Sequence, residues 1–251
     1  MPRGILPTVG ACAILTVDPV ASLDPDTREF DPEAVAACKN LPSKKYLAFV
    51  HSRLAIYQPW EAYNQCIVHF ILRGEPNAVP DKCIEPSMSI PIEPMTSAAH
   101  VSGRVPLKPS TPLPWDDCYI TSFSAAFVNH PTAFTEDPID YVLDREELRR
   151  VDLFLADDVR RNKDMAHRKE VESAKDICSV PQNSNPSSDS PRVGGDDEDS
   201  DGDSSGPAFD DSPTHQIFEP TIVVNFTHDL STMDGLGDPA DYFKEVEAIA
   251  G

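Results

Sequence analysis

The sequence predicts an α+β protein with a small, mostly helical core, a few short strands, an irregular proline-rich arm and a disordered acidic segment. Aromatic and aliphatic residues are densest in Ser43–Gly74. The chain has 25 prolines in 251 residues, roughly twice the usual share. We therefore expect a turn-rich segment with a short strand at 1–30, a folded core at 31–178, an acidic tether at 179–213, and a strand and helix at 214–251 that dock on the core.

The overall charge limits the partners of the protein. The formal net charge is −21, which repels nucleic acid and anionic membrane surfaces. No apolar run reaches the ~20 residues that a membrane span requires. The apolar run near the N-terminus is interrupted by Pro7 and Gly10, so it makes a poor secretory signal. We expect the cytosol or the nucleus rather than secretion, and six dispersed cysteines that are reduced and mostly buried.

The central stretch is interpreted as two helices that meet at Pro59, which suits a first helical position. Ser43 is a suitable N-cap. The apolar residues recur at helical spacing, and they are Leu47, Val50, Leu54 and Tyr57, then Trp60, Tyr63, Ile67, Phe70 and Ile71. The alternative is a strand over Cys66–Leu72, where β-branched residues are frequent.

Local signals define the elements before and after this stretch. A strand is expected at Ala11–Val17, and a helix that Asp31 caps is expected to end at Lys39. Residues 75–117 contain nine prolines, which predicts either a polyproline-like arm on the core or a loose loop. Period-two alternation predicts a strand over Trp115–Val128 with an aromatic face.

The C-terminal half begins with the longest predicted helix. Asp137-Pro138 is expected to start it, and the apolar stripe ends near Arg160, where the helix should leave the core. Residues 179–213 contain almost no apolar side chains and should be disordered. Thr221–Thr227 is expected to be a strand, and a last helix should run from Asp238-Pro239 to about Ala250.

Two glycine- and acid-rich patterns resemble ligand motifs only in part. Gly235–Ala240 matches G-x-G-x-x-A between a strand and a helix. However, the segment between the predicted strand and the first glycine is too long for the tight turn that the motif needs, and no second strand follows. Asp197, Asp199 and Asp201 match the first positions of a calcium loop, but Ala208 stands where the loop needs a glutamate. The glycine pattern is favoured as part of a helix cap, and the aspartate pattern as a solvated acidic tract. No cofactor is expected.

A zinc site is the remaining metal hypothesis. Cys66 and His69 would share a helical face, and Cys83, His100 or Cys118 would complete the site. A structural zinc site usually has two closely spaced ligand pairs, and this chain has one. A buried thiol and a hydrogen-bonded histidine are therefore the favoured interpretation, and no metal is expected.

Two segments are candidates for partner binding. A basic patch lies in the second half of the long helix, and large apolar residues lie among acids near the end of the tether. The predicted partner-binding residues are Arg160, Arg161, Lys163, Arg168, Lys169, Phe209, Ile217 and Phe218. The basic patch could also bind the acidic tether itself. Ser190 and Ser212 precede prolines and are candidate phosphorylation sites.

These observations favour a non-enzymatic interaction or regulatory protein with an unidentified protein partner. No P-loop, nucleophile elbow, zinc-protease helix or C-x-x-C motif is present. Two alternatives stay open. One is a small enzyme with a site around Cys66, His69, Trp115 and Cys118. The other is a nucleic-acid-associated factor that uses the basic patch at 160–169.

Overall fold

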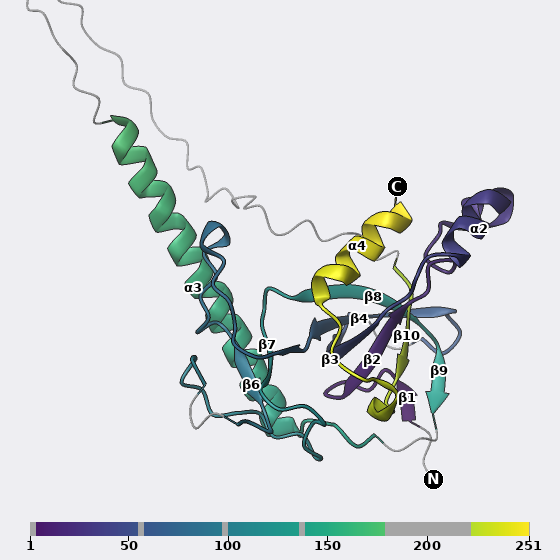
Figure 1. The fold of residues 1–251 in the computed structure, drawn as a ribbon, viewed down its shortest axis with the longest axis horizontal. Helices are drawn as coiled ribbons and strands as arrows, with labels where there is room; N and C mark the ends of the chain where they lie inside the picture. The colour runs from purple at the N-terminus through teal and green to yellow at the C-terminus, as the bar shows by residue number, and fades with distance from the viewer. Residues whose placement is uncertain (1–3, 55–57, 97–99, 136–138, 179–221, 251) are drawn as a thin grey trace, which may run out of the picture.

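A curled five-stranded antiparallel sheet forms the body of the protein. The computed structural model describes residues 4–54, 58–96, 100–135, 139–178 and 222–250. The edge strands approach each other, because the Asn129 N–H donates to the Ile222 carbonyl at 2.8 Å. The sheet therefore curls into a small barrel (Figure 1). Its strand order is β10 (Val224–Thr227), β2 (Cys12–Val17), β3 (Lys45–Arg53), β4 (Tyr63–Phe70) and β8 (Ala125–Pro131).

The prediction of a small, mostly helical core is wrong, because the core is built on sheets. The predicted helical pair in Ser43–Gly74 is the β3–β4 hairpin, and the strand alternative for Cys66–Leu72 is the correct one. Ser43 Oγ donates to the Val17 carbonyl at 3.0 Å instead of capping a helix. The residues of β3 from Tyr46 to Val50 are all buried. Since both faces of the strand are covered, its apolar run shows no period of two.

The inside of the barrel is one of two hydrophobic clusters. Alternate residues of the strands point into it, among them Leu15, Tyr46 and Phe70. Helix α4 (Pro239–Ala250) packs against this cluster, where the ring centroid of Tyr242 lies 4.8 Å from that of Phe70. The Tyr46 hydroxyl donates to Glu245 of the same helix at 2.6 Å. The predicted C-terminal strand and helix are confirmed by β10 and α4.

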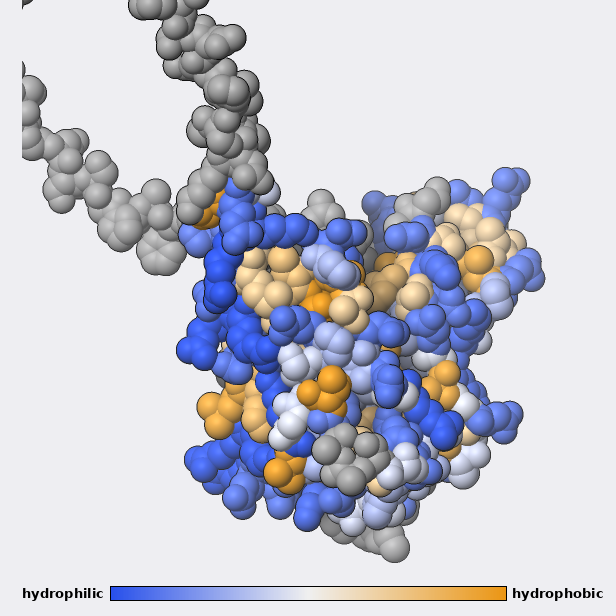
Figure 2. Space-filling model, turned by 60° about the vertical axis from the view of Figure 1, so that its left-hand side comes forward, coloured by the Kyte–Doolittle hydropathy of each residue, from blue (hydrophilic) through white to orange (hydrophobic). Residues whose placement is uncertain are grey.

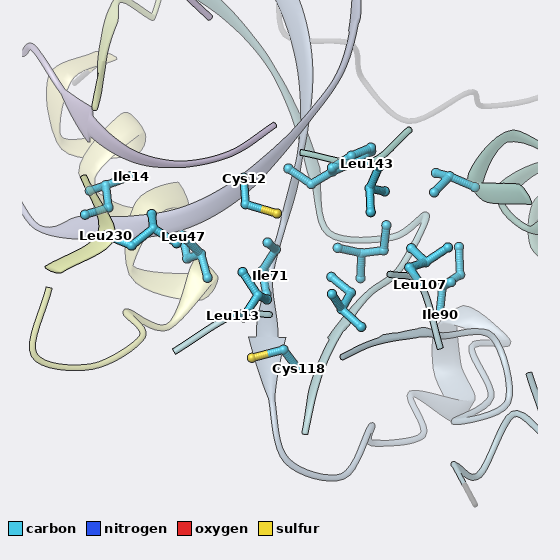
Figure 3. Close-up of a cluster of buried hydrophobic side chains, with 14 of the residues drawn as sticks. Cys12, Ile14, Leu47, Ile71, Ile90, Leu107, Leu113, Cys118, Leu143 and Leu230 are labelled. Atoms are coloured by element: carbon cyan, nitrogen blue, oxygen red, sulfur yellow. The ribbon is translucent and has the colours of Figure 1, made fainter. Parts of the chain in front are cut away.

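The second cluster lies on the outer face of the barrel. It is covered by a three-stranded sheet with the order β5 (Leu72–Arg73), β7 (Cys118–Ile120), β6 (Ile90–Ile92). The proline-rich arm docks here, because Ile90, Ile92 and Leu107 are all buried in this cluster. Figure 3 shows Ile90 and Leu107 among its side chains. The predicted strand at Trp115–Val128 is wrong as a single strand. The chain turns after Ile120, so β7 joins the outer sheet and β8 joins the barrel.

Short elements complete the body. Strands β1 (Gly4–Leu6) and β9 (Ala133–Thr135) form a two-stranded ribbon. The prediction of a helix after Asp31 is confirmed by α2 (Pro32–Lys39), where the Asp31 carboxylate accepts from the Glu33 and Ala34 N–H groups. The strand predicted at Ala11–Val17 is confirmed by β2. The remaining short elements are α1 (Pro25–Phe30), η1 (Pro80–Lys82) and η2 (Leu230–Thr232).

Helix α3 (Arg145–Cys178) is the longest element and extends beyond the barrel (Figure 1). Its 34 residues correspond to a length of about 51 Å. The predicted start at Asp137-Pro138 is wrong. Asp144 occupies the capping position instead, because its carboxylate accepts from the N–H groups of Glu146 and Glu147 at 2.8 and 2.9 Å. The acidic tether proposed for 179–213 lies outside the described residues.

Candidate interaction surface

A seam of side chains joins α3 to the proline-rich arm. The seam begins with apolar residues, and Val151 and Leu155 are buried in the outer cluster. At the same helical spacing, Asp158 and Asn162 follow and face the arm through hydrogen bonds. The helix therefore stays attached beyond Arg160, although its apolar stripe ends there.

A buried ion pair lies at the centre of the seam. The Arg104 guanidinium forms two bonds with the Asp158 carboxylate, at 2.5 and 2.8 Å, and one with the Ser89 carbonyl at 3.2 Å. Asp158 is fully buried, and the Arg104 side chain is 10% exposed. The guanidinium also lies over the Phe154 ring, 4.6 Å from its centroid. This bidentate geometry fixes the arm against the middle of α3.

The loop around η1 is held to the next turn of α3. The Asn162 side chain donates to the carbonyls of Lys82 and Cys83 at 2.7 and 2.8 Å. Arg161 donates to Glu85 at 2.8 Å. Lys169 Nζ lies 3.3 Å from the Pro80 carbonyl oxygen, about two helical turns further along α3. These contacts place the loop beside α3 as one wall of a groove.

The groove between this loop and α3 has a volume of about 460 Å³. Its lining is mostly apolar, and the charged lining side chains of α3 are exposed. We call it the η1–α3 groove. It is lined by Ala78, Pro80, Cys83, Ile84 and Glu85 from the loop and by Met165, Arg168, Lys169 and Glu172 from the helix.

Beside the groove and just past it, α3 presents its side chains to solvent. Every side chain from His167 to Ser173 is exposed, including Val171 at 38%. The surface seen in Figure 2 is largely hydrophilic, with apolar residues gathered in small patches between charged ones. This part of α3 is therefore available for contact in the described structure.

The structure divides the predicted basic patch into two groups. Arg160 is bonded to Asp157 at 2.6 Å, and Arg161 is bonded to Glu85, so their charges are largely compensated within the protein. Arg168 and Lys169 line the η1–α3 groove, and Lys163 is exposed on the same helix. The sequence could not show this division of the patch, because the contacts of Arg161 and of Lys169 are made with the η1 loop, which is distant in the chain.

The residues of the enzymatic alternative do not converge. Cys66 points into the barrel, whereas His69 lies on the opposite face of β4 and approaches the Thr121 carbonyl at 3.0 Å. Trp115 and Cys118 belong to the outer cluster, where Cys118 Sγ lies 3.3 Å from the Trp115 carbonyl oxygen. In a strand, residues three apart point in opposite directions, so the shared face expected for Cys66 and His69 does not exist.

The buried thiols are poor nucleophiles. Burial raises the pKa of Cys12, of Cys66 and of Cys118 to about 12, so each is protonated at neutral pH. The described cysteines other than Cys178 are free and buried. Within the described ranges, no group of three or more His, Cys, Asp or Glu side chains is arranged to hold a metal ion.

Several predicted residues cannot be placed. Phe209, Ile217 and Phe218, the phosphorylation candidates Ser190 and Ser212, and the partial calcium pattern lie outside the described residues. None of the helices in the described part of the chain is long and apolar enough to span a membrane.

Comparison with known proteins does not assign the chain to a family. No family model, no curated protein and no solved structure gives a significant match.

Proposed function

We propose that the protein is a non-enzymatic interaction module, in which the barrel holds α3 as a recognition arm and the η1–α3 groove receives part of a protein partner. The observation that carries this proposal is a groove of about 460 Å³ with a mostly apolar lining, beside a helix whose outer side chains are exposed. The ion pair of Arg104 with Asp158 anchors the helix behind the groove, so the binding surface is preorganised.

The chemistry of the groove specifies the kind of partner. Pro80, Ile84 and Met165 offer apolar contact, and Arg168 and Lys169 add positive charge. Of the two acids in the lining, Glu85 is bonded to Arg161, so Glu172 is the remaining negative charge and one net positive charge is left. A partner segment with one or two large apolar side chains next to a carboxylate would match both features. This chemistry favours a protein segment over nucleic acid, because the −21 net charge of the chain opposes a polyanion.

Charge reversal at the groove tests the proposal. Full-length wild-type protein, the double variant Arg168→Glu/Lys169→Glu and the control Arg149→Glu would be used for affinity capture from native extract. Arg149 is exposed on the same helix, far from the groove lining. We expect specific partners to be lost with the double variant and kept with the control. Binding of one purified partner should then fall roughly tenfold or more in the double variant, as for a lost charged contact.

Equal binding of one purified partner to all three proteins would contradict the proposal. A version that lacks residues 181–213 separates the groove from the acidic segment. If this deletion abolishes capture while the groove variant binds normally, the acidic segment is the binding element and the groove is not.

A further inference from the structure

A chain of three ionisable side chains lies between α3 and the outer face of the barrel. Asp152 Oδ1 lies 2.8 Å from His51 Nε2, and His51 Nδ1 lies 3.3 Å from His69 Nε2. His69 Nδ1 then lies 3.0 Å from the Thr121 carbonyl oxygen. The chain therefore runs from α3 across β3 and β4 to the turn after β7.

A bulge in β3 brings the two imidazoles together. The register between β3 and β4 shifts between Val50 and Ser52, so His51 is the extra residue. His69 pairs with Phe49 on the outer face of the sheet, and the rings of His51 and His69 meet edge to face with centroids 5.0 Å apart. The bulge thus aims His51 at both His69 and Asp152.

The hydrogen-bond partners determine which ring nitrogens carry hydrogen. The Asp152 carboxylate and the Thr121 carbonyl can only accept, so His51 Nε2 and His69 Nδ1 must be the donors. In two neutral imidazoles, the remaining nitrogens would then face each other with lone pairs across 3.3 Å. One additional proton turns this repulsive contact into an N–H···N hydrogen bond.

We propose that His51 and His69 bind one shared proton, and that this proton ties α3 to the sheet through Asp152. The proton resides on His51 Nδ1, so His51 donates from both nitrogens while His69 accepts. The positive charge is balanced by Asp152, which is the titratable group of α3 in contact with the pair. Phe49 of β3 and the Thr121 carbonyl are the uncharged neighbours. This inference is independent of the proposed function.

The surroundings of His69 oppose a second proton. The residue is 5% exposed, and burial lowers the pKa of His69 to about 4, with a further lowering by His51. A metal ion could also bridge two imidazole nitrogens. Asp152 contacts the other nitrogen of His51, and within the described residues no group of three His, Cys, Asp or Glu side chains is arranged to hold a metal there. The proton is therefore the favoured occupant, and a metal is an outcome of the test.

Imidazole nitrogen NMR on the full-length protein between about pH 5 and about pH 8 tests the proposal. We expect His69 to be in the Nδ1–H tautomer, with the shared proton seen as a coupling between His51 Nδ1 and His69 Nε2. Asp152→Asn should weaken this coupling, because it removes the balancing charge. The control Asp157→Asn, on the same helix but bonded to Arg160, should leave the coupling unchanged.

Amide exchange in α3 gives a second readout. Exchange around Leu148–Leu155 should be slower when the shared proton is bound, and this pH dependence should be absent in His51→Gln but present in His167→Gln. An Nε2–H tautomer at His69, or a His51–His69 coupling that Asp152→Asn leaves unchanged, would overturn the proposal. Stoichiometric Zn²⁺ binding that His51→Gln abolishes would replace the proton with a metal and would also overturn it.

Discussion

Gly237 lies where the chain before α4 passes so close to strand β3 that a side chain does not fit. A Cβ at this position would lie 2.5 Å from the Lys45 carbonyl oxygen and 3.1 Å from the Tyr46 ring. The match of Gly235–Ala240 to a dinucleotide motif is thereby explained in part without a ligand. Gly237 is needed because backbone and backbone almost touch, whereas a Cβ at Gly235 would have no atom within 4 Å.

The two glycines therefore form a matched pair for mutation. Gly237→Ala should lower the free energy of unfolding by about 1–3 kcal/mol, because α4 and β3 must separate to admit the methyl group. Gly235→Ala should change it by less than about 0.5 kcal/mol. Urea unfolding of both variants measures the difference, and equal losses would show that the close approach does not limit packing.

At the scale of elements, α3 shows how a helix can stay attached where its apolar stripe ends. Asp158 is fully buried, and its charge is matched by Arg104. Removing one member of a buried pair leaves the other charge uncompensated, which is costlier than the net value of the pair itself.

Asp158→Ala should therefore destabilise the protein by about 3–5 kcal/mol. The control Asp157→Ala removes an exposed contact with Arg160 and a looser one with Arg104 at 3.9 Å, and it should cost at most about 1 kcal/mol. Denaturant unfolding monitored by circular dichroism gives both values. In the double variant Arg104→Met/Asp158→Leu, most of the loss should be recovered; a loss as large as in the single variant would show that packing, and not charge, dominates.

At the scale of the whole molecule, buried histidines link folding to pH. Burial lowers the pKa of His69 to about 4, and burial also lowers the pKa of His130 and of His100. The folded protein thus binds fewer protons than the unfolded chain between the ordinary histidine pKa and the lowered one. Stability from this source is complete above about pH 6.5 and is lost as the pH falls towards about 4.

His69 alone should account for roughly 3 kcal/mol of this loss, since burial lowers its pKa to about 4. His69→Gln should flatten the decrease of the unfolding free energy between about pH 6.5 and about pH 4. The exposed His167→Gln serves as the control and should keep the wild-type slope. Thermal unfolding across this range measures both, and an unchanged slope in His69→Gln would contradict the assignment.

Local chemistry explains which elements could be predicted. The Asp31 cap of α2 and the Pro239 start of α4 act within one turn of the helix, and the sequence shows them directly. The hairpin of β3 and β4 has no such local signal, because the inside of the barrel and the outer cluster bury both faces of these strands. An apolar run that is buried on both sides fits a helix and a strand equally well.

The candidate surface was predictable only in its location on the long helix. The composition of α3 predicted exposed positive charge near Arg168 and Lys169, but the η1–α3 groove depends on a loop some eighty residues earlier in the chain. The pairing of His51 with His69 likewise depends on a bulge in a strand that the sequence did not predict.

The sequence by itself determined helices α2 and α4, the β2 and β10 strands and the strongly acidic charge, because these depend on neighbouring residues or on composition alone. Only the tertiary structure decided that the central stretch is sheet, that α3 is anchored by Arg104 and Asp158, and that its exposed end borders a groove. The physical reason is that strand pairing and buried ion pairs join residues far apart in the chain. Their stabilising energy depends on both partners, so it cannot be inferred from either segment alone.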